Sequence, residues 1–491
     1  MLKGNIMTRR TRRQFMEDSM LATAMAAAAT TPMVHAEETK QSDSPNEKLG
    51  VAVVGVRGRG GSHIGAFAGR KDTEILYIVD ADSDVGQRRA SEVGKRQGGR
   101  TPQFVEDMRR AFEDDRVDIV SIATPNHWHA LAAIWAIQAG KDVYVEKPVS
   151  HNVSEGRRIV EAARKYGKIV QTGTQSRSNP GMRQTMDAIH TGKIGDVSVA
   201  RGLCYKRRGS IGARGKYDVP GNVNYDLWLG PAPDVALSRP QFHYDWHWQW
   251  DYGNGDLGNQ GIHQMDLARW ALQEEGLSDS CISFGGRLGY IDAGDSANTQ
   301  VVAHRYGDKA LTFEVRGLET APYKGAKLGV IVEGSDGYAV IPTYNSGTIF
   351  DKDGNQVKSF SGGADHFDNF IKAVRSRKIE DLTADIEEGH LSSALCHLGN
   401  ISYRLGQVVA PNEVLEIMKD FDSADDMVDT FQRTMNHAKG QKVNFEETPF
   451  TIGVPIEINT ADETIVGNAK ANEMLTREYR KPFVVPAAGQ V

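Results

Sequence analysis

The glycine-rich stretch at residues 55–61, Gly-Val-Arg-Gly-Arg-Gly-Gly, is the first part of the chain whose residue types could do chemistry. It follows residues 51–54, an apolar and mostly β-branched run that is typical of a buried parallel strand. Glycines permit a turn too tight for side chains, and a helix that begins at such a turn directs free N–H groups and a positive dipole at a pyrophosphate. The spacing therefore predicts a dinucleotide-binding loop. The residues expected to approach the dinucleotide here are Gly55, Arg57, Gly58, Arg59 and Gly60.

Asp80 ends the second predicted strand, residues 74–79, at the distance from the glycines where dinucleotide-binding proteins place an acidic residue. A carboxylate there would accept hydrogen bonds from the adenosine ribose hydroxyls and repel a 2′-phosphate. NAD is therefore favoured over NADP. Arg57 or Arg59 could still bind the extra phosphate, so NADP stays open, as does a glycine-rich loop that binds no dinucleotide.

Two polar segments follow the next predicted strands of the series. Thr-Pro-Asn-His-Trp-His at residues 124–129 follows the strand at 117–122, and Val-Glu-Lys-Pro at 145–148 ends the strand at 142–145. Open α/β sheets bind their ligands at the carboxyl ends of their strands, so both segments are expected at the cofactor. The residues predicted to contact the cofactor from these segments are Thr124, Asn126, His129, Glu146 and Lys147.

A third pattern, Gly-Asn-Gln-Gly-Ile-His-Gln-Met-Asp, occupies residues 258–266. Together with the glycine loop and the Glu-Lys-Pro segment, it resembles the Gfo/Idh/MocA oxidoreductase family over about residues 48–410. The resemblance implies a dinucleotide domain joined to a sheet domain, with a catalytic lysine in Glu-Lys-Pro and a histidine on a helix of the second domain. In this chain these two residues are Lys147 and His263.

One position departs from the family pattern, because many members have an aspartate four residues before the histidine and this chain has Asn259. Positions four apart on a helix share a face, so Asn259 and His263 are expected to point into one pocket. An amide can orient a hydroxyl but cannot hold a negative charge. Support for a protonated His263 would then be weaker, unless Asp256 or Asp251 supplies the charge.

The resemblance implies an NAD(P)-dependent oxidoreductase that acts on a sugar or polyol hydroxyl. His263 is the expected base for the hydroxyl proton, and the Lys147 ammonium would stabilise the developing alkoxide while hydride passes to the nicotinamide. Two alternatives stay open. One is an NAD-dependent glycoside hydrolase or lyase that oxidises its sugar only transiently, and the other is a sugar-sensing protein without catalysis.

Other residues could touch the substrate. Gln175 and Arg177 follow the last strand of the nucleotide domain, and residues 242–250 hold three of the chain's seven tryptophans. Aromatic faces stack on sugar rings, so Trp246 and His247 are predicted to bind substrate, although an alternating strand with a buried aromatic face explains the same pattern. No Cys or Glu cluster completes a site around the nearby histidines, so no metal is expected.

The first 36 residues resemble a twin-arginine export signal. Arg12-Arg13 precedes an Ala-rich run and Val34-His35-Ala36, which suits a cleavage site. A basic amphipathic leader is the alternative. Because twin-arginine machinery carries folded proteins, we expect a periplasmic or secreted enzyme that leaves the cytoplasm with its cofactor tightly bound.

Elements that would position these residues follow from the hydrophobic pattern. A signal at 1–36 and a polar linker at 37–47 precede an NAD-binding Rossmann domain at 48–173, a C-terminal sheet domain for substrate at 174–410 and an ordered extension at 411–491. The fold class is therefore α/β, with a Rossmann domain followed by an α+β domain with a large, mainly antiparallel sheet. Strands in the second domain are predicted at 196–206, 282–290, 298–306, 310–316, 327–333 and 338–341, and helices at 365–375 and 386–404.

The amino-acid composition restricts the classes of partner that the chain is expected to bind. The chain has 491 residues, 40% of them hydrophobic, and a net charge of −6, which gives no electrostatic footprint for nucleic acid. Three widely spaced cysteines argue against a disulfide framework. The expected partners are a small sugar or polyol, the twin-arginine machinery and further copies of the chain, through the C-terminal sheet.

Overall fold

The computed structural model describes residues 48–491, so the predicted signal and linker at residues 1–47 lie outside the described residues. The chain begins with a six-stranded parallel sheet in the order β3-β2-β1-β4-β5-β6. Its strands are β1 (Leu49–Val54), β2 (Thr73–Val79), β3 (Gln103–Val105), β4 (Ile119–Ile122), β5 (Asp142–Val145) and β6 (Val170–Thr172). The helices between them are α2 (Gly60–Phe67), α3 (Ser83–Arg96), α4 (Arg109–Phe112), α5 (Asn126–Gln138) and α6 (Val153–Lys165). This doubly wound arrangement brings the carboxyl ends of β1 and β4 together at the point where the strand order reverses.

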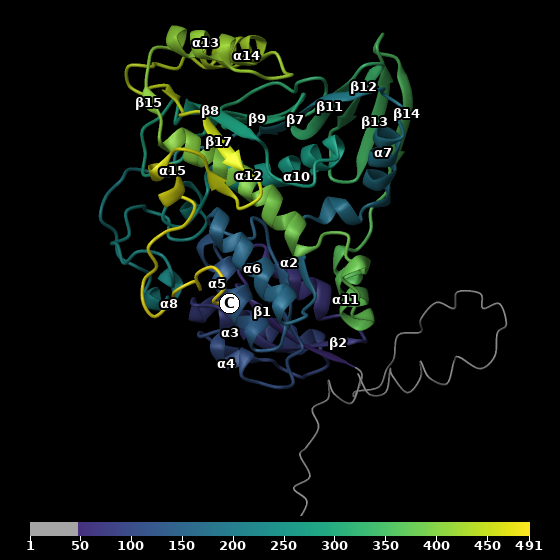
Figure 1. Ribbon diagram of the computed structural model, residues 1–491. Coiled ribbons are helices and arrows are strands. Elements are labelled where there is room, and N and C mark those ends of the chain that lie inside the picture. The colour runs from purple at the N-terminus through teal and green to yellow at the C-terminus, as the bar shows by residue number, and fades with distance from the viewer. Residues whose placement is uncertain (1–47) are drawn as a thin grey trace, which may run out of the picture.

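Burial explains why these segments form the centre of a sheet. All six residues of β1 and all four of β4 and of β5 are buried, as expected for parallel strands covered on both faces. Helix α5 is buried on nearly all sides because α6 covers one side and the C-terminal segment covers another. The ring of Phe483 lies 5.5 Å from the ring of Trp128 and 6.2 Å from that of Trp135. The end of the chain therefore returns to the nucleotide domain (Figure 1).

The second domain is built on a 12-stranded sheet in which only β7 and β10 pair in parallel. Its main path runs β14-β13-β12-β11-β7-β10-β9-β8-β16-β15, with β17 and β18 added beside β8. The strands are β7 (Val197–Tyr205), β8 (Ser280–Gly286), β9 (Thr299–Tyr306), β10 (Lys309–Arg316), β11 (Leu328–Gly334), β12 (Gly337–Ile341), β13 (Ser346–Asp351), β14 (Gln356–Ser361), β15 (Gln407–Val408), β16 (Thr451–Ile452), β17 (Ile456–Asn459) and β18 (Thr464–Ile465). The predicted fold class is thus confirmed.

Three helices fill the layer between this sheet and the nucleotide domain (Figure 1). They are α7 (Pro180–His190), α10 (Gly261–Leu272) and α12 (Ile386–Arg404), and their buried residues join those of the sheet in one core. The other helices are α8 (Tyr225–Leu229), α9 (Gly255–Asn259), α11 (His366–Ser376) and α15 (Ala469–Glu473), with 3₁₀ helices at Gln175–Ser178, Asp245–Trp248 and Ile379–Asp381. The aromatic segment at 242–250 is therefore a loop with one 3₁₀ turn, and its alternative reading as a strand is wrong.

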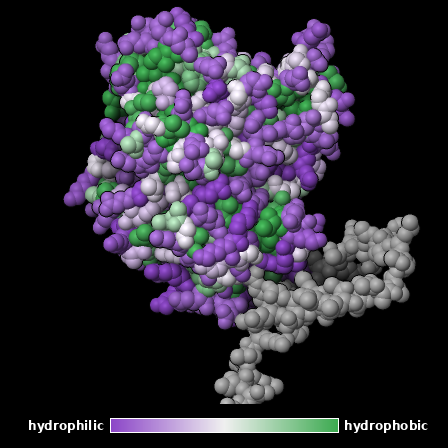
Figure 2. All heavy atoms as spheres, viewed as in Figure 1, coloured by the Kyte–Doolittle hydropathy of each residue, from purple (hydrophilic) through white to green (hydrophobic). Residues whose placement is uncertain are grey.

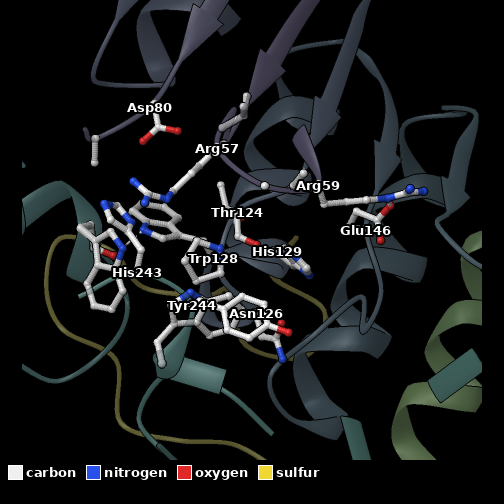
Figure 3. A pocket seen from close by; sticks show the side chains of 18 of the residues that line it. Arg57, Arg59, Asp80, Thr124, Asn126, Trp128, His129, Glu146, His243 and Tyr244 are labelled. Atoms are coloured by element: carbon white, nitrogen blue, oxygen red, sulfur yellow. Dashed lines mark hydrogen bonds and ion pairs between the residues drawn. The ribbon is translucent and has the colours of Figure 1, made fainter. Parts of the chain in front are cut away.

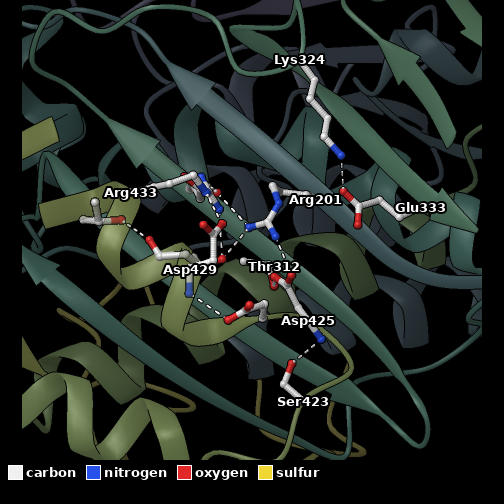
Figure 4. Close-up of polar contacts among 12 residues, drawn as sticks. Arg201, Thr312, Lys324, Glu333, Ser423, Asp425, Asp429 and Arg433 are labelled. Atoms are coloured by element: carbon white, nitrogen blue, oxygen red, sulfur yellow. Dashed lines mark hydrogen bonds and ion pairs between the residues drawn. The ribbon is translucent and has the colours of Figure 1, made fainter. Parts of the chain in front are cut away.

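The opposite face of the sheet carries α13 (Pro411–Asp420) and α14 (Met427–Gly440) over β8 and β9. A buried ionic network joins this helix pair to the sheet (Figure 4). Arg201 on β7 donates to Glu314 on β10 (2.9 Å) and to Asp425 (2.5 Å), and Arg433 on α14 donates to Glu314 (2.8 Å). The helix pair is therefore joined to the sheet by buried charges as well as by apolar contacts.

Hydrophilic side chains dominate the face of the molecule seen in Figure 2, with apolar residues scattered among them. Within residues 48–491, none of the helices combines the length and the apolar character needed to cross a membrane. The three cysteines are buried and free, in agreement with the expectation of no disulfide framework.

Candidate functional site

A cavity of about 440 Å³ lies where the carboxyl ends of the Rossmann strands meet the second domain. Its volume is within the range typical of small-molecule sites. Most of the predicted site residues line it together. They are Gly55, Arg57, Gly58, Arg59, Asp80, Thr124, Asn126, His129, Glu146, Lys147, Gln175, Trp246, His247, Asn259 and His263. Gly60 and Arg177 are not among the lining residues.

The glycine loop has the shape that a pyrophosphate requires. Gly55 has φ +79°, and a Cβ there would lie 2.7 Å from the backbone of Ala123. A Cβ on Gly60 would lie 1.9 Å from the carbonyl oxygen of Gly55, whereas one on Gly58 would have no neighbour within 4 Å. Gly55 and Gly60 are thus needed for packing, and Gly58 leaves open space at the cavity. Helix α2 begins here without a side-chain cap, and the N–H groups of Gly61 and Ser62 donate to the carbonyls of Gly58 (3.1 Å) and Arg59 (2.9 Å). The positive end of the helix dipole is therefore directed at the loop.

Asp80 lies at one end of the cavity (Figure 3). Its Oδ2 accepts from the backbone N–H of Val56 (2.8 Å) and its Oδ1 from that of Asp82 (3.0 Å). Burial raises the pKa of Asp80 to about 6, although these two hydrogen bonds oppose the rise. Each oxygen keeps a further lone pair, so the carboxylate can still accept from ribose hydroxyls.

The two arginines of the loop point in opposite directions (Figure 3). Arg59 Nε donates to Glu146 Oε1 at 2.6 Å, so its guanidinium is engaged away from Asp80. Arg57 reaches toward the Asp80 end, where its Nη1 lies 3.8 Å from Asp82 Oδ2 and its side chain is 55% exposed. Of the two, only Arg57 is placed to meet a 2′-phosphate.

Glu146 is a buried carboxylate that contacts side chains of the glycine loop and of helix α2. Besides Arg59, its Oε1 is 3.2 Å from His63 Nε2, and the other ring nitrogen of His63 is 2.8 Å from Ser121 Oγ. Burial would raise the pKa of Glu146, but the hydrogen bond from His63 and the charge of Arg59 hold it well below its usual range. Glu146 therefore places a negative charge next to Lys147.

The side chain of Lys147 is hydrogen-bonded to the backbone at the point where one helix ends and the next begins. Helix α9 ends at Asn259 and α10 begins at Gly261, so Asn259 and His263 do not lie on one regular helix as predicted. The His263 N–H donates to the carbonyl of Gln260 (3.3 Å), three residues back, and the carbonyl of Asn259 accepts from Lys147 Nζ (2.9 Å). The residue that departs from the family pattern thus binds the lysine through its backbone.

His263 lines the cavity and is 6% exposed. Burial and then the charge of Lys147 lower its pKa to about 3, so the imidazole is neutral at physiological pH. Its Nδ1 is buried and without a hydrogen-bond partner among the described residues. Neither aspartate considered from the sequence pairs with this ring, because Asp256 is bound by Arg208 (2.7 and 2.9 Å) and Asp251 lines a different cavity.

Sequence reasoning missed Tyr344, which comes from the loop between β12 and β13. Its ring centroid is 4.8 Å from that of His263, and Gln260 Nε2 donates to its hydroxyl at 2.6 Å. No sequence signal links this residue to the site, since it lies in a loop 81 positions after His263. Tyr244, with φ 70° and 51% exposure, also lines the cavity; only its place in the aromatic segment pointed to it.

The other predicted residues differ in their placement. Trp246 and His247 line the cavity with their rings stacked at 3.6 Å, and the Oε1 of Gln175 and Oγ1 of Thr124 are buried there without a partner among the described residues. Both ring nitrogens of His129 contact carbonyl oxygens, of Pro148 (2.5 Å) and Thr124 (2.8 Å), so this side chain ties the two loops together.

Arg177 is not brought to the cavity. It donates to both oxygens of Asp266 (3.0 and 2.9 Å) and to Glu388 (2.9 Å), and its guanidinium lies over Trp270 at 5.1 Å. The ion pairs link the loop after β6 to α10 and α12. A role in the packing of these helices accounts for all of its contacts.

Comparison with known proteins agrees with this architecture. Residues 49–174 match the model of the oxidoreductase family with an NAD-binding Rossmann fold, and residues 197–438 match its C-terminal alpha/beta domain. An inositol 2-dehydrogenase of Rubrobacter xylanophilus is 32% identical over 231 residues, 47% of this chain and 54% of that protein. A 1,5-anhydro-D-fructose reductase of Ensifer adhaerens is 32% identical over 263 residues, 52% of this chain and 68% of that protein. The matched segments thus span about half to two thirds of these relatives.

Among solved structures, the WlbA dehydrogenase from Bordetella pertussis in complex with NADH and UDP-GlcNAcA shares the fold. The TM-score is 0.54 at 20% identity, over 72% of this chain and 97% of that chain. At this identity the likeness shows the fold alone. The two family models together cover most of the described residues, and the chain therefore belongs to the Gfo/Idh/MocA family of NAD(P)-dependent oxidoreductases.

Proposed function

We propose that the protein transfers hydride between a secondary hydroxyl of a sugar or polyol and NAD, with Lys147 and His263 as its catalytic residues. The observation that carries this proposal is that both side chains line the same cavity as the glycine loop and Asp80. The loop, the uncapped N-terminus of α2 and the free lone pairs of Asp80 suit a dinucleotide. The printed activities of the two relatives support the substrate class.

The neutral imidazole of His263 suits a base that accepts the hydroxyl proton. Lys147 Nζ donates one hydrogen bond, to Asn259, within the described residues, which leaves two N–H groups for the reacting oxygen. Its positive charge stabilises the developing alkoxide and also opposes protonation of His263. The nicotinamide supplies the hydride acceptor when the cofactor is bound.

Trp246 and His247 form the sugar-facing wall in this proposal. Their rings are stacked with an interplanar angle of 19°, and flat aromatic surfaces suit the C–H faces of a sugar ring. Burial lowers the pKa of His247 to about 3, so the pair carries no charge at neutral pH.

The proposal is tested by incubating the protein with NAD and inositol, and with NADH and 1,5-anhydro-D-fructose, while following the absorbance of the reduced nicotinamide. Net oxidation or reduction changes this absorbance. The redox-neutral hydrolase or lyase would instead convert a glycoside with no net change. Failure of both assays across a panel of sugars, polyols and glycosides would contradict the proposal.

Replacing Asp80 with alanine is expected to lower the preference for NAD over NADP, because the carboxylate that repels a 2′-phosphate is lost and Arg57 remains beside it. The measurement is the ratio of the two dissociation constants. The double variant Asp80→Ala, Arg57→Ala should bind NADP more weakly than Asp80→Ala does, because the arginine that would meet the 2′-phosphate is also removed. An unchanged ratio in the single variant would show that another residue selects the cofactor.

Replacing Asn259 with aspartate is expected to move the acid limb of the rate profile to higher pH. A carboxylate at this cavity-lining position favours the protonated imidazole, so the pKa of His263 should rise from about 3 and the base should be lost earlier on acidification. Asn259→Ser serves as the uncharged control. If the pH dependence of kcat/KM is unaltered, the two side chains do not interact.

Export by the twin-arginine route is part of the proposal, supported by the Arg12-Arg13 motif and the Ala-rich run. An exported enzyme has little free NAD outside the cytoplasm, so its cofactor should be tightly bound. We expect purified protein to contain close to one NAD(H) per chain that survives dialysis, measured by mass spectrometry after heat release. Protein isolated empty, with activity restored by added NAD, would contradict tight binding.

A further inference from the structure

A second cavity, of about 610 Å³, lies between α12, the loop at 233–254 and the segment at 473–480. It shares no lining residue with the first cavity. The residues at 473–480 lie beyond the stretch matched by the family models. The loop that carries Trp246 and His247 into the first cavity carries Trp250 and Asp251 into the second.

His151 lines this cavity and is held by Arg477. Arg477 Nη1 donates to His151 Nδ1 at 3.2 Å, and burial together with the charge of Arg477 lowers the pKa of His151 well below its ordinary value. The ring is therefore neutral, with its proton on Nε2. That Nε2 is buried and has no partner among the described residues.

Two guanidinium groups face the same space. Within residues 48–491, Arg404 forms no hydrogen bond or ion pair; its guanidinium lies 5.1 Å from the centre of the Trp250 ring. Arg477 uses Nη1 for His151 and for the carbonyl of Asp251 (3.0 Å). Burial lowers the pKa of Arg404, the charge of Asp251 opposes this, and the charge of Arg477 lowers it further. Arg404 and Arg477 thus line the same cavity and repel each other; the charge of Asp251 attracts both, and that of Asp295 also attracts Arg404.

We propose that this second cavity binds a carboxylate-bearing sugar, a hexuronate. The carboxylate would accept from Arg404 and Arg477, whose planar guanidinium groups suit such an anion. The ring would lie beside Trp250, with Asp251 and Asn400 available to its hydroxyls. The site goes beyond the proposed hydride transfer and does not depend on it.

The test is calorimetric titration of the purified full-length protein with D-glucuronate, compared with D-glucose and inorganic phosphate. Glucuronate should bind, and Arg404→Gln should weaken it about 10-fold or more, since a hydrogen-bonded ionic contact is lost. Arg404 has no polar contact to lose among the described residues, so this variant should melt like the wild type. Arg183→Gln, which removes an equal charge from α7, is the matched control and should bind normally.

A second pair of variants tests which of the two cavities binds glucuronate. Trp250→Ala should weaken glucuronate binding, whereas Trp246→Ala, in the first cavity, should leave it unchanged. Glucose binding as tightly as glucuronate would overturn the role of the charge, and phosphate binding as tightly would overturn the sugar. No binding of glucuronate at millimolar concentration, or a loss confined to Trp246→Ala, would overturn the site itself.

Discussion

Replacing Lys147 or His263 with alanine is expected to lower kcat by about 10²- to 10⁴-fold, the usual effect of removing a well-placed acid or base. Lys147→Ala removes the ammonium that Asn259 holds in the cavity, and His263→Ala removes the neutral imidazole beside it. Binding of NAD should persist in both variants, because the glycine loop and Asp80 are unchanged. The measurement is kcat with the best sugar, together with the dissociation constant of NAD.

Lys193→Ala, at an exposed position after α7, is the control for loss of a lysine and should retain activity. The double variant of Lys147 and His263 should be little worse than either single variant, because residues that act on one reacting oxygen are not additive. Near-normal turnover in either single variant would remove that residue from the mechanism. Loss of NAD binding would assign it to the cofactor instead.

Acidification below pH 6.5 is expected to destabilise the fold steeply. Burial lowers the pKa of several histidines from an ordinary 6.5 to about 3. They are His127, His247, His263, His304 and His397. Between these values the unfolded chain binds protons that the folded chain does not, so stability is complete above pH 6.5 and is lost as the pH falls toward 3.

Each of these histidines contributes a slope of up to about 1.4 kcal/mol per pH unit. Together they could offset a typical stability of about 5–15 kcal/mol within roughly two pH units. Thermal unfolding measured from pH 7.5 to 4 checks this expectation. His304→Gln, which removes one such group from the core, should move the acid transition to lower pH. A melting temperature that is constant over this range would show that the histidines are not buried in neutral form.

Much of the fold could be predicted because buried strands and helices have recognisable apolar patterns in the sequence. The continuous apolar run of β1 predicted a strand, and the pattern at 386–404 predicted the helix α12; the structure places both at nearly the same residues. The short edge strand β3 and the exposed strand β14 were not predicted, since neither has a continuous apolar pattern. Their pairing depends on neighbouring strands rather than on their own residues.

The part of the candidate site that consists of local sequence motifs could be predicted. The glycine loop, Glu-Lys-Pro and His263 each belong to a pattern of a few residues, and the strand ends bring them together. Tyr344 and the placement of Arg177 required the tertiary structure, because an isolated tyrosine in a turn and an arginine near a strand end have many possible roles. The interruption at Gln260 was also missed, since no proline marks it.

Transfer of deuterium from substrate to cofactor tests hydride transfer most directly. The protein is mixed with inositol deuterated at its ring carbons, and the dinucleotide is released and analysed by mass spectrometry. The account predicts NADH that carries one deuterium in the wild type, and no labelled dinucleotide in Lys147→Ala or His263→Ala. The same measurement applies to any deuterated sugar that the screen shows to be oxidised with net reduction of NAD. A substrate that is oxidised with net reduction of NAD but leaves the dinucleotide unlabelled in the wild type would contradict it.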